Sequence, residues 1–598
     1  MLPKYAIGID LGTTNSVLAY ASLESETPQV AMLPIPQLVS PQSVERRNSL
    51  PSFLYLARSG ESESREFDLP WAENREFAVG EVARSQSSEN PDRTVGTAKS
   101  WLCHSQVDRH QSILPWKAPD HVAQVSPVTA SQRYLEHLVA AWTQKFPDAP
   151  IAQQQIVLTV PASFDASARE LTREAALAAG LPETLVLLEE PQAATYAWLC
   201  SSGDDWRKSL SAGDRLLVCD VGGGTTDLTL VAADEEDGEL QLRRQAVGNH
   251  LLVGGDNMDL ALAYHVSELF RQKGTDLNPW QSVSLCHSCR AAKEALLAAD
   301  GPETQTISVA GRGSRLIGGS VSVEVNRADV ARLLVDGFFA QCDITDLPSR
   351  QRVSGFQEIG LPYEADTAIT RHLAAFLQRQ TDEGSAAAPA PTHVLFNGGV
   401  FKSDRLQQAL LDRLADWYGA AAPLILAGAH DFDYAVGRGA AYYAWTNERG
   451  GVRIRGGTPR SYYVGIETAG LAIPGAPRPM SALCVVPHGM EEGTEADVPS
   501  EEIGLVVGEA ARFRIFSSAR RTHDVPGDKL VRWSADEIVE TDSMETTLEA
   551  GPDAGDEYVP VRFQSRITEL GIFELSCVHT ATGEIWKLKF SVRDDAEA

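Results

Sequence analysis

The chain has 598 residues, a hydrophobic fraction of 43% and a formal net charge of −29 at pH 7. This length exceeds what a single hydrophobic core supports, so we expect two or more folded units. The negative charge repels phosphate backbones and anionic lipid, which argues against nucleic acid and membranes as partners.

The sequence contains no apolar run long enough to span a membrane and no leader typical of a signal peptide. Its eight cysteines are scattered along the chain. Because such usage is typical of free thiols in a reducing compartment, we expect a cytoplasmic protein.

The first predicted element is a hairpin over residues 5–20, where two apolar runs flank a Gly-Thr turn. After it, hydrophobic periodicity predicts a helix, a buried strand, a helix, a buried strand and a helix. Their expected ranges are 133–146, 156–160, 166–179, 185–188 and 190–199. Pro161 ends the first of these strands, and Gly180 ends the second helix.

Residues 215–232 repeat the pattern of the first hairpin, with an apolar strand, an aspartate, a Gly/Thr turn and a second apolar strand. This repetition indicates an internal duplication. A strand at 393–396 then leads into Asn397-Gly398-Gly399, and helices are expected at 404–416 and 434–446. We therefore predict a nucleotide-binding α/β unit over residues 1–446 with two lobes that divide near residue 212.

The composition changes to a Gly- and Arg-rich segment at 447–460, which we interpret as a linker. Beyond it, Phe573, Leu575 and Cys577 alternate with polar residues, which predicts a β-sandwich over residues 461–598. The acidic segment 491–502 is expected to be a solvated loop, and 384–391 a flexible surface insertion.

The two Gly/Thr turns have the composition of phosphate-binding loops, because glycine lets backbone N–H groups approach a phosphate chain closely. Asp10, Asp220 and Asp227 are placed to hold Mg²⁺ through its waters or to orient a hydrolytic water. Hydroxyl donors come from Thr13, Thr14, Thr225 and Thr226. Two such turns facing each other across a cleft would clamp a polyphosphate from both sides.

Six motifs in this order resemble the heat shock protein 70 chaperones of the DnaK type. They are GIDLGTTNS (8–16), TVPASF (159–164), LLEEPQAATYAW (187–198), DVGGGTTDL (220–228), GNHLLVGGDNMD (248–259) and DYAVGRGAA (433–441). The resemblance covers roughly residues 1–445 and, more weakly, 458–470. It implies an actin-like ATPase fold with duplicated ribonuclease-H-like lobes, ATP or ADP with Mg²⁺ as cofactors, and unfolded polypeptides and co-chaperones as partners.

The resemblance also implies roles for single residues. Lys99, Glu190, Asp220, Asp10 and Asp227 would be catalytic, with Asp10 and Asp220 near the metal and Lys99 near the γ-phosphate. Pro161 and Arg169 match a proline switch and an arginine that relays the nucleotide state. The implied nucleotide contacts are Gly12, Thr13, Thr14, Asn15, Gly222, Gly223, Gly224, Thr225, Gly254, Gly255, Lys293, Gly398, Gly399 and Asp433.

Several positions depart from the family pattern. Arg290 stands where glutamate is usual and Glu294 where arginine is usual, on the helix expected to face adenosine. Val400 and Lys402 replace the usual serine and arginine after the glycine pair. The family's acidic, leucine-rich linker is replaced by Gly-Arg-rich sequence, and a helical lid is not expected.

Three other functions remain open at this stage. A small-molecule kinase of the same superfold is disfavoured by Lys99 and by the Pro161/Arg169 pair, and a filament protein by the separate β-rich unit. A regulatory ATPase that uses the β-rich unit to bind proteins is compatible with the altered linker. Cys286 and Cys289 have no second cysteine pair, so we interpret them as buried thiols rather than metal ligands.

Overall fold

The structure is a computed structural model of the whole chain. The described residues are 2–58, 60–104, 107–236, 238–249, 251–309, 321–349, 361, 363–380, 388–419, 423–426, 431–458, 460–467, 480–491, 493–506, 510–534, 537–547, 558–568 and 573–590.

The first lobe is built on a mixed sheet with the strand order β11-β10-β1-β2-β3, in which β6 also pairs with β2. The bounds are β1 Tyr5–Leu11, β2 Asn15–Ser22, β3 Ala31–Met32, β6 Leu50–Pro51, β10 Gln155–Val160 and β11 Val186–Glu189. The central strand β1 runs parallel to β10 and antiparallel to β2. Five of the seven residues of β1 are buried and the other two are half-buried, which is consistent with its apolar run.

The second lobe has a sheet with the order β18-β17-β12-β13-β14-β19. The bounds are β12 Arg215–Val221, β13 Thr226–Glu236, β14 Glu239–Val247, β17 His393–Asn397, β18 Leu424–Ile425 and β19 Ile454–Arg455. Strand β12 runs parallel to β17 and antiparallel to β13, as β1 does to β10 and β2. The shared order and directions confirm the predicted duplication.

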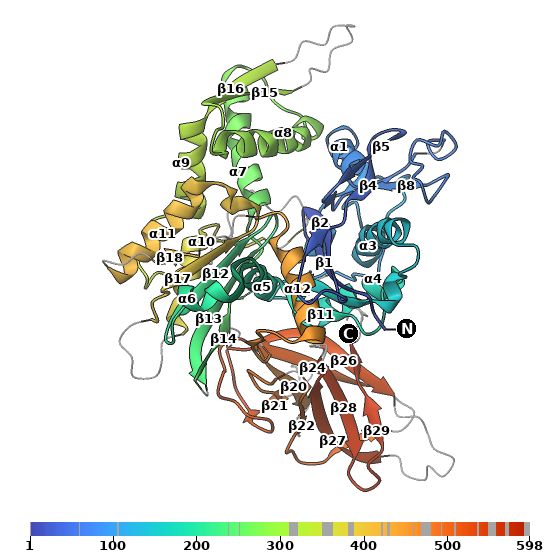
Figure 1. Cartoon of the computed structure of the whole chain (residues 1–598), viewed down its shortest axis with the longest axis vertical. Helices are drawn as coiled ribbons and strands as arrows, with labels where there is room; N and C mark the ends of the chain where they lie inside the picture. Colours follow the sequence, from blue (N-terminus) through green and yellow to red (C-terminus); the bar gives the residue numbers. More distant parts are fainter. Residues whose placement is uncertain are drawn as a thin grey trace, which may run out of the picture.

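Helices and small strands complete both lobes (Figure 1). In the first lobe they are β4 Ile35–Ser40, β5 Ser43–Arg47, β7 Leu54–Leu56, β8 Phe77–Val79, β9 Thr94–Val95, α1 Glu81–Glu89, α2 Ala98–Trp101, α3 Pro127–Lys145 and α4 Ala166–Ala178. In the second they are α7 Gly255–Gln272, α8 Pro279–Leu297, α9 Arg327–Phe338, α10 Ile369–Gln378, α11 Asp404–Tyr418, β15 Thr304–Val309 and β16 Val321–Asn326.

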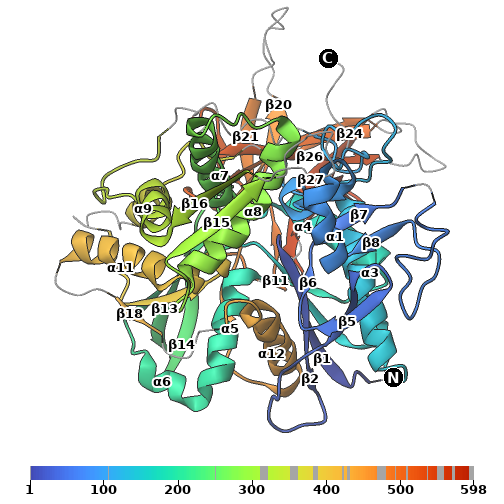
Figure 2. The ribbon, with the colours of Figure 1, turned by 90° about the horizontal axis from the view of Figure 1, so that it is seen from above.

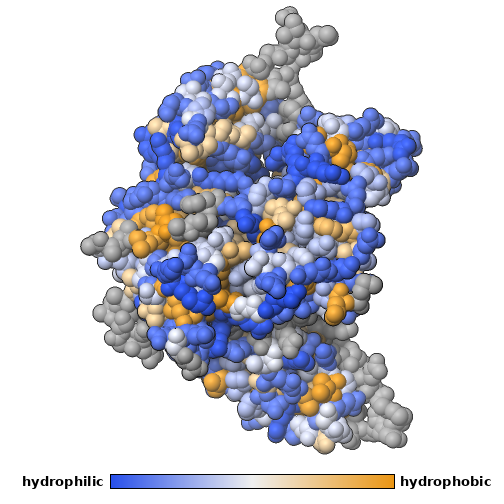
Figure 3. Space-filling view, in the orientation of Figure 1, coloured by the Kyte–Doolittle hydropathy of each residue, from blue (hydrophilic) through white to orange (hydrophobic). Residues whose placement is uncertain are grey.

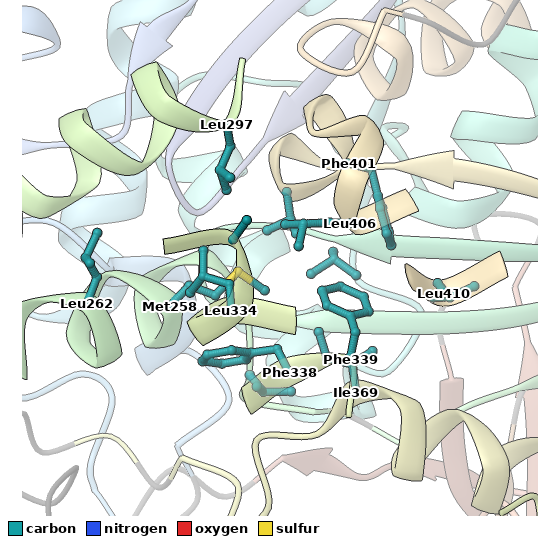
Figure 4. Packing of buried hydrophobic residues seen from close by; sticks show 14 of the residues in the cluster. Met258, Leu262, Leu297, Leu334, Phe338, Phe339, Ile369, Phe401, Leu406 and Leu410 are labelled. Atoms are coloured by element: carbon teal, nitrogen blue, oxygen red, sulfur yellow. The ribbon is translucent and has the colours of Figure 1, made fainter. Parts of the chain in front are cut away.

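Each lobe has its own hydrophobic cluster. In the second lobe, helices α7, α9 and α11 pack apolar side chains such as Met258, Phe338 and Leu410 beneath the sheet (Figure 4). In the first lobe, α3 and α4 cover the sheet with residues such as Trp142 and Leu171. Two separate cores are what a chain of this length requires.

Two helices join the lobes, α5 (Glu190–Ser202) and α12 (Ala435–Arg449), with the short α6 (Trp206–Ser209) after α5 (Figure 2). Their apolar side chains form a third cluster with residues from both sheets, for example Val157 and Val218. The two helices cross closely at Gly439, where any side chain would overlap the backbone of Ala193. A small residue at this crossing therefore sets how near the lobes lie.

The C-terminal region contains two antiparallel sheets. Their strands are β20 Ser461–Glu467, β21 Met480–Val486, β22 Glu495–Asp497, β23 Ile503–Val506, β24 Ala510–Ser518, β25 Lys529–Leu530, β26 Val539–Thr547, β27 Tyr558–Ile567, β28 Phe573–His579, β29 Ile585–Lys587 and β30 Lys589–Phe590. One sheet has the order β25-β21-β20-β24-β26-β30, and the other β22-β27-β28-β29 with β23 beside β27. Side chains from both, such as Val464 and Phe563, share one hydrophobic cluster.

Most predicted elements lie where expected, and the differences have local causes. Helix α3 begins at Pro127 rather than 133, because the Ser126 side chain accepts the Thr129 N–H and Pro127 suits the first helical turn. Helix α12 continues to Arg449, where Gly450 ends it with φ 82°. The expected solvated loop 491–502 contains the short strand β22.

The predicted linker is partly ordered as strand β19, which pairs in parallel with β14. Part of the proposed surface insertion, residues 384–387, lies outside the described residues, as do 468–470 of the weaker family motif. Within the part of the chain that is described, no helix combines the length and apolar character needed to cross a bilayer. Hydrophilic residues cover most of the face seen in Figure 3.

Candidate functional site

The predicted aspartates lie at equivalent places in the two lobes. Asp10 is near the end of β1 and Asp220 near the end of β12, the central strands of the two sheets. Asp227 lies on β13 directly opposite Asp220. The duplicated topology therefore directs all three carboxylates toward the region between the lobes.

Lys99 and Glu190 meet in the same region although 91 positions separate them. Lys99 lies on α2, and Glu190 is the first residue of α5. The positive end of the helix dipole stabilises a carboxylate at that position. The Lys99 ammonium donates to Glu190 Oε1, and both side chains are largely buried. Burial alone would lower the pKa of Lys99, but Glu190 and Asp10 more than offset it and raise that pKa.

Burial raises the pKa of every aspartate in this cluster. The pKa of Asp10 rises to about 6, because burial and Glu190 outweigh the opposing effects of Lys99 and Thr159. The pKa of Asp227 rises to about 7, mainly through burial and Glu190. Burial and Glu190 also raise the pKa of Asp220 well above its usual value. Four carboxyl groups around one lysine form a site that favours added positive charge.

The two Gly/Thr turns lie against each other. A side chain on Gly223 would overlap the Thr14 hydroxyl, and one on Gly224 would approach Thr13 Cγ2 and Ser100 Oγ. Gly12 is equally confined, since a Cβ there would overlap the carbonyl of Asn15. Thr225 closes the second turn by accepting the Gly222 N–H at 3.0 Å. The turns thus bring half-buried backbone together next to the strands that carry the carboxylates.

The N-terminus of α7 adjoins the second turn. The Gly255 N–H donates to Gly222 O at 2.9 Å, and the Asp256 N–H donates to Gly223 O at 2.7 Å. A Cβ on Gly254 would lie 2.7 Å from Gly223 O. Glycines at these positions let the helix start and the turn touch backbone to backbone.

The predicted adenosine-side residues are held by aspartates. Lys293 pairs with Asp259 at 2.6 Å and donates to Gly255 O at 3.0 Å. Arg290 pairs with Asp256 and donates through Nε to Asp259 at 2.8 Å. The departure at Arg290 is therefore balanced electrostatically by carboxylates on the neighbouring helix α7.

The turn Asn397-Gly398-Gly399, which follows β17, packs against Asp220 of the carboxylate cluster. Gly398 has φ 86°, and a Cβ there would overlap Val221 O and lie 2.8 Å from Asp220 Oδ1. Gly399, in contrast, has open space where a Cβ would be. Asp433 pairs with Lys402 at 2.6 Å instead of with a residue of the carboxylate cluster. Both side chains of this pair are about half exposed.

Pro161 follows strand β10, and Arg169 lies on α4, whose first residue Ala166 packs with the C-terminal sheets. Arg169 donates to Glu189 Oε1 at 2.7 Å and to the carbonyl of Phe164 at 3.1 Å. Glu189 also binds the buried Arg244. Burial alone would raise the pKa of Glu189, but Arg244 and Arg169 outweigh it and lower that pKa.

Three neutral donors that sequence reasoning missed each hold one aspartate. Thr159 Oγ1 donates to Asp10 Oδ1 at 3.0 Å, and Asn397 Nδ2 donates to Asp220 Oδ2 at 2.7 Å. The Ser163 hydroxyl donates to Asp227. The available signal was their position, because Thr159 lies near the end of β10, Asn397 ends β17 and Ser163 follows β10.

The site fits a magnesium-bound nucleotide by its donor chemistry. Carboxylates are the side chains that Mg²⁺ prefers, usually with water between them and the ion. Among the described residues no three acidic, histidine or cysteine side chains converge closely enough to hold a metal directly. Both Cys286 and Cys289 are free thiols; Cys289 is buried as expected, whereas Cys286 is only half-buried.

Two lobes with the same core strand order, joined by crossing helices around a carboxylate cluster and glycine turns, are consistent with an actin-like ATPase fold. The Hsp70 protein family model matches residues 70–343. This match supports membership of the Hsp70 family. Membership supports an ATP-binding, chaperone-like function and ATPase activity.

Proposed function

We propose that this protein is a slow, Mg²⁺-dependent ATPase that couples its nucleotide state to the binding of unfolded polypeptide. Residues 1–446 would be the nucleotide-binding domain, 447–460 the linker and 461–598 a β-sandwich that binds polypeptide. The observation that carries the ATPase proposal is the convergence of Asp10, Lys99, Glu190, Asp220 and Asp227 beside two glycine turns.

The proposed chemistry assigns a task to each group. The N–H groups of both turns bind phosphate oxygens, and Lys99 stabilises the negative charge of the transferred phosphoryl group. Asp10 and Asp220 would hold Mg²⁺ through its waters, and the bound ion would supply positive charge to offset that of the phosphate chain. Asp227 and Glu190 orient the attacking water, whose proton a carboxylate can accept.

Contacts of the linker strand with α5, and of the first lobe with the C-terminal sheets, support coupling. The Ile454 N–H of β19 donates to the Tyr196 hydroxyl on α5 at 2.9 Å. Ala166, at the start of α4, belongs to the hydrophobic cluster of the C-terminal sheets. The segment from Pro161 to Arg169 therefore connects the turn beside Asp227 to the proposed β-sandwich. Through it, nucleotide state can alter how the β-sandwich docks.

The deciding experiment measures ATP turnover with and without Mg²⁺, and with and without an unfolded apolar peptide. We expect turnover that needs Mg²⁺ and rises with peptide. Lys99→Ala should abolish turnover while nucleotide binding remains measurable, whereas Lys208→Ala, an exposed lysine, should match the wild type.

The outcomes separate the parts of the proposal. Wild-type turnover in Lys99→Ala would refute the assignment of the site. Turnover that peptide leaves unchanged would favour the alternative, a regulatory ATPase whose C-terminal region binds other proteins. Phosphorylation of an added small molecule would instead identify a kinase.

A further inference from the structure

The three cleft aspartates share an arrangement that the ATPase assignment does not by itself require. Each carboxylate has one oxygen bound by a neutral side-chain donor. Oδ1 of Asp10 is held by Thr159, and Oδ2 of Asp220 by Asn397. A donor held in this way restricts the rotation of the carboxylate that it binds.

Two of these donors occupy equivalent positions in the duplicated lobes. Thr159 on β10 is the register partner of Asp10 on β1, and Asn397 on β17 is the register partner of Asp220 on β12. Strands β10 and β17 both lie parallel to the central strand of their sheet. Residues paired in this way across parallel strands point to the same face, so both donors reach the carboxylate beside them.

Ser163 supplies the donor for the third carboxylate from a turn rather than from a strand. Its hydroxyl and its backbone N–H both bind Asp227. The turn in question begins at Pro161 and leads into α4. Asp227 is thus held from the first lobe although it belongs to the second, which fixes its position across the cleft.

Burial makes these donors strong constraints. Thr159 is 0% exposed, and Ser163 and Asn397 are each 3% exposed. Water has little access to these side chains, so the hydrogen bonds decide where the carboxylates point. Positions of carboxylates around a metal and its waters are commonly set in this way by a surrounding layer of donors.

Asn397 shows that the arrangement serves more than the satisfaction of polar groups. Its Oδ1 is buried and has no hydrogen-bond partner among the described residues, although its Nδ2 binds Asp220. The side chain borders a small hollow of about 40 Å³ that Ala194 and Trp198 also line. An apolar residue would remove this unpaired oxygen but would also take the donor from the buried Asp220, so the asparagine is explained by its bond to the carboxylate rather than by its own packing.

We infer that Thr159, Ser163 and Asn397 are positioning residues, which hold Asp10, Asp227 and Asp220 in the geometry needed for Mg²⁺ coordination and water attack. This inference rests on the proposed ATPase function. The three residues act through the aspartates and do not touch the nucleotide. Loss of one donor lets the carboxylate rotate, and misplacement of about 1 Å lowers a rate by about 100-fold.

The test compares isosteric variants that lack the donor with variants that keep it. Thr159→Val, Ser163→Ala and Asn397→Leu should each lower the single-turnover rate of ATP hydrolysis about 10- to 100-fold. Thr159→Ser and Ser163→Thr keep the hydroxyl and should stay within about threefold of the wild type. The affinity for ATP should change little, since the glycine turns supply most phosphate contacts.

Thr229→Val is the matched control. Thr229 is a buried threonine on β13, and its hydroxyl has no partner among the described residues. Its loss should leave the rate unchanged. Equal rates for Thr159→Val and Thr159→Ser would overturn the inference, because the hydroxyl would then be irrelevant. So would three donor-free variants that all hydrolyse ATP as the wild type does.

The experiment separates this inference from the proposed function. If the wild type hydrolyses ATP and the donor-free variants do too, only the inference fails. If the wild type binds ATP without hydrolysing it, the proposed function fails. The Mg²⁺ dependence of ATP affinity then becomes the readout. Asn397→Leu should need at least about tenfold more Mg²⁺ than the wild type for the same affinity, and an unchanged requirement would overturn the inference.

Discussion

Replacing Asp227 by asparagine should stabilise the nucleotide-free protein, and more so at high pH. Asp227 is buried, and its pKa is raised from 3.8 to about 7 by burial and by Glu190. The substitution keeps the shape of the side chain but removes the buried charge. An asparagine oxygen can still accept the Ser163 hydroxyl, so the local hydrogen bond is preserved.

The size of the effect follows from the pKa difference between the folded and unfolded chain. Below pH 3.8 both states are protonated, and Asp227 has no pH-dependent effect. Above it the unfolded state ionises first, so stability falls until the pH passes about 7. At about 1.36 kcal/mol per pH unit, the ionisable group costs roughly 1.5 kcal/mol at pH 5 and about 4 kcal/mol at pH 8.

Thermal unfolding of the nucleotide-free protein at pH 5 and pH 8 measures this difference. Asp227→Asn should raise the unfolding temperature at both pH values, with the larger increase at pH 8. Glu235→Gln, an exposed acid on the same strand, is the control and should shift neither value appreciably. An increase that is the same at both pH values, or larger at pH 5, would refute the argument that burial of this carboxyl limits stability.

Three further predictions concern other parts of the molecule. Lys99→Ala should destabilise the protein by about 3–5 kcal/mol in denaturant unfolding, since it leaves the buried Glu190 unpaired; an unchanged midpoint would contradict this. Gly398→Ala should lower stability by about 1–3 kcal/mol because of its positive φ, while Gly399→Ala should leave the unfolding midpoint unchanged; equal midpoints for the two variants would contradict this. Ile454→Asp should release strand β19 and abolish peptide stimulation of ATP turnover while the basal rate persists; retained stimulation would show that β19 does not carry the coupling.

The sequence by itself determined the elements and their repetition. Continuous apolar runs predict buried strands, and prolines and glycines mark where elements end. These are local properties of the sequence, as are the two similar Gly/Thr turns, so the elements could be predicted with nearly correct limits. The paired positions of Asp10 and Asp220 followed from the repetition. Helix limits such as Pro127 were missed because capping depends on single side chains near the helix start.

Only the tertiary structure decided which residues meet. Lys99 and Glu190 are 91 positions apart, and their pairing depends on how α2 and α5 pack around the sheet. Thr159 and Asn397 became visible as donors only through strand register, which local sequence does not encode. Residues 454–455 join a sheet because β14 offers an unpaired edge, so a segment with linker composition became ordered. Local chemistry thus determined which groups are available, and long-range packing determined their partners.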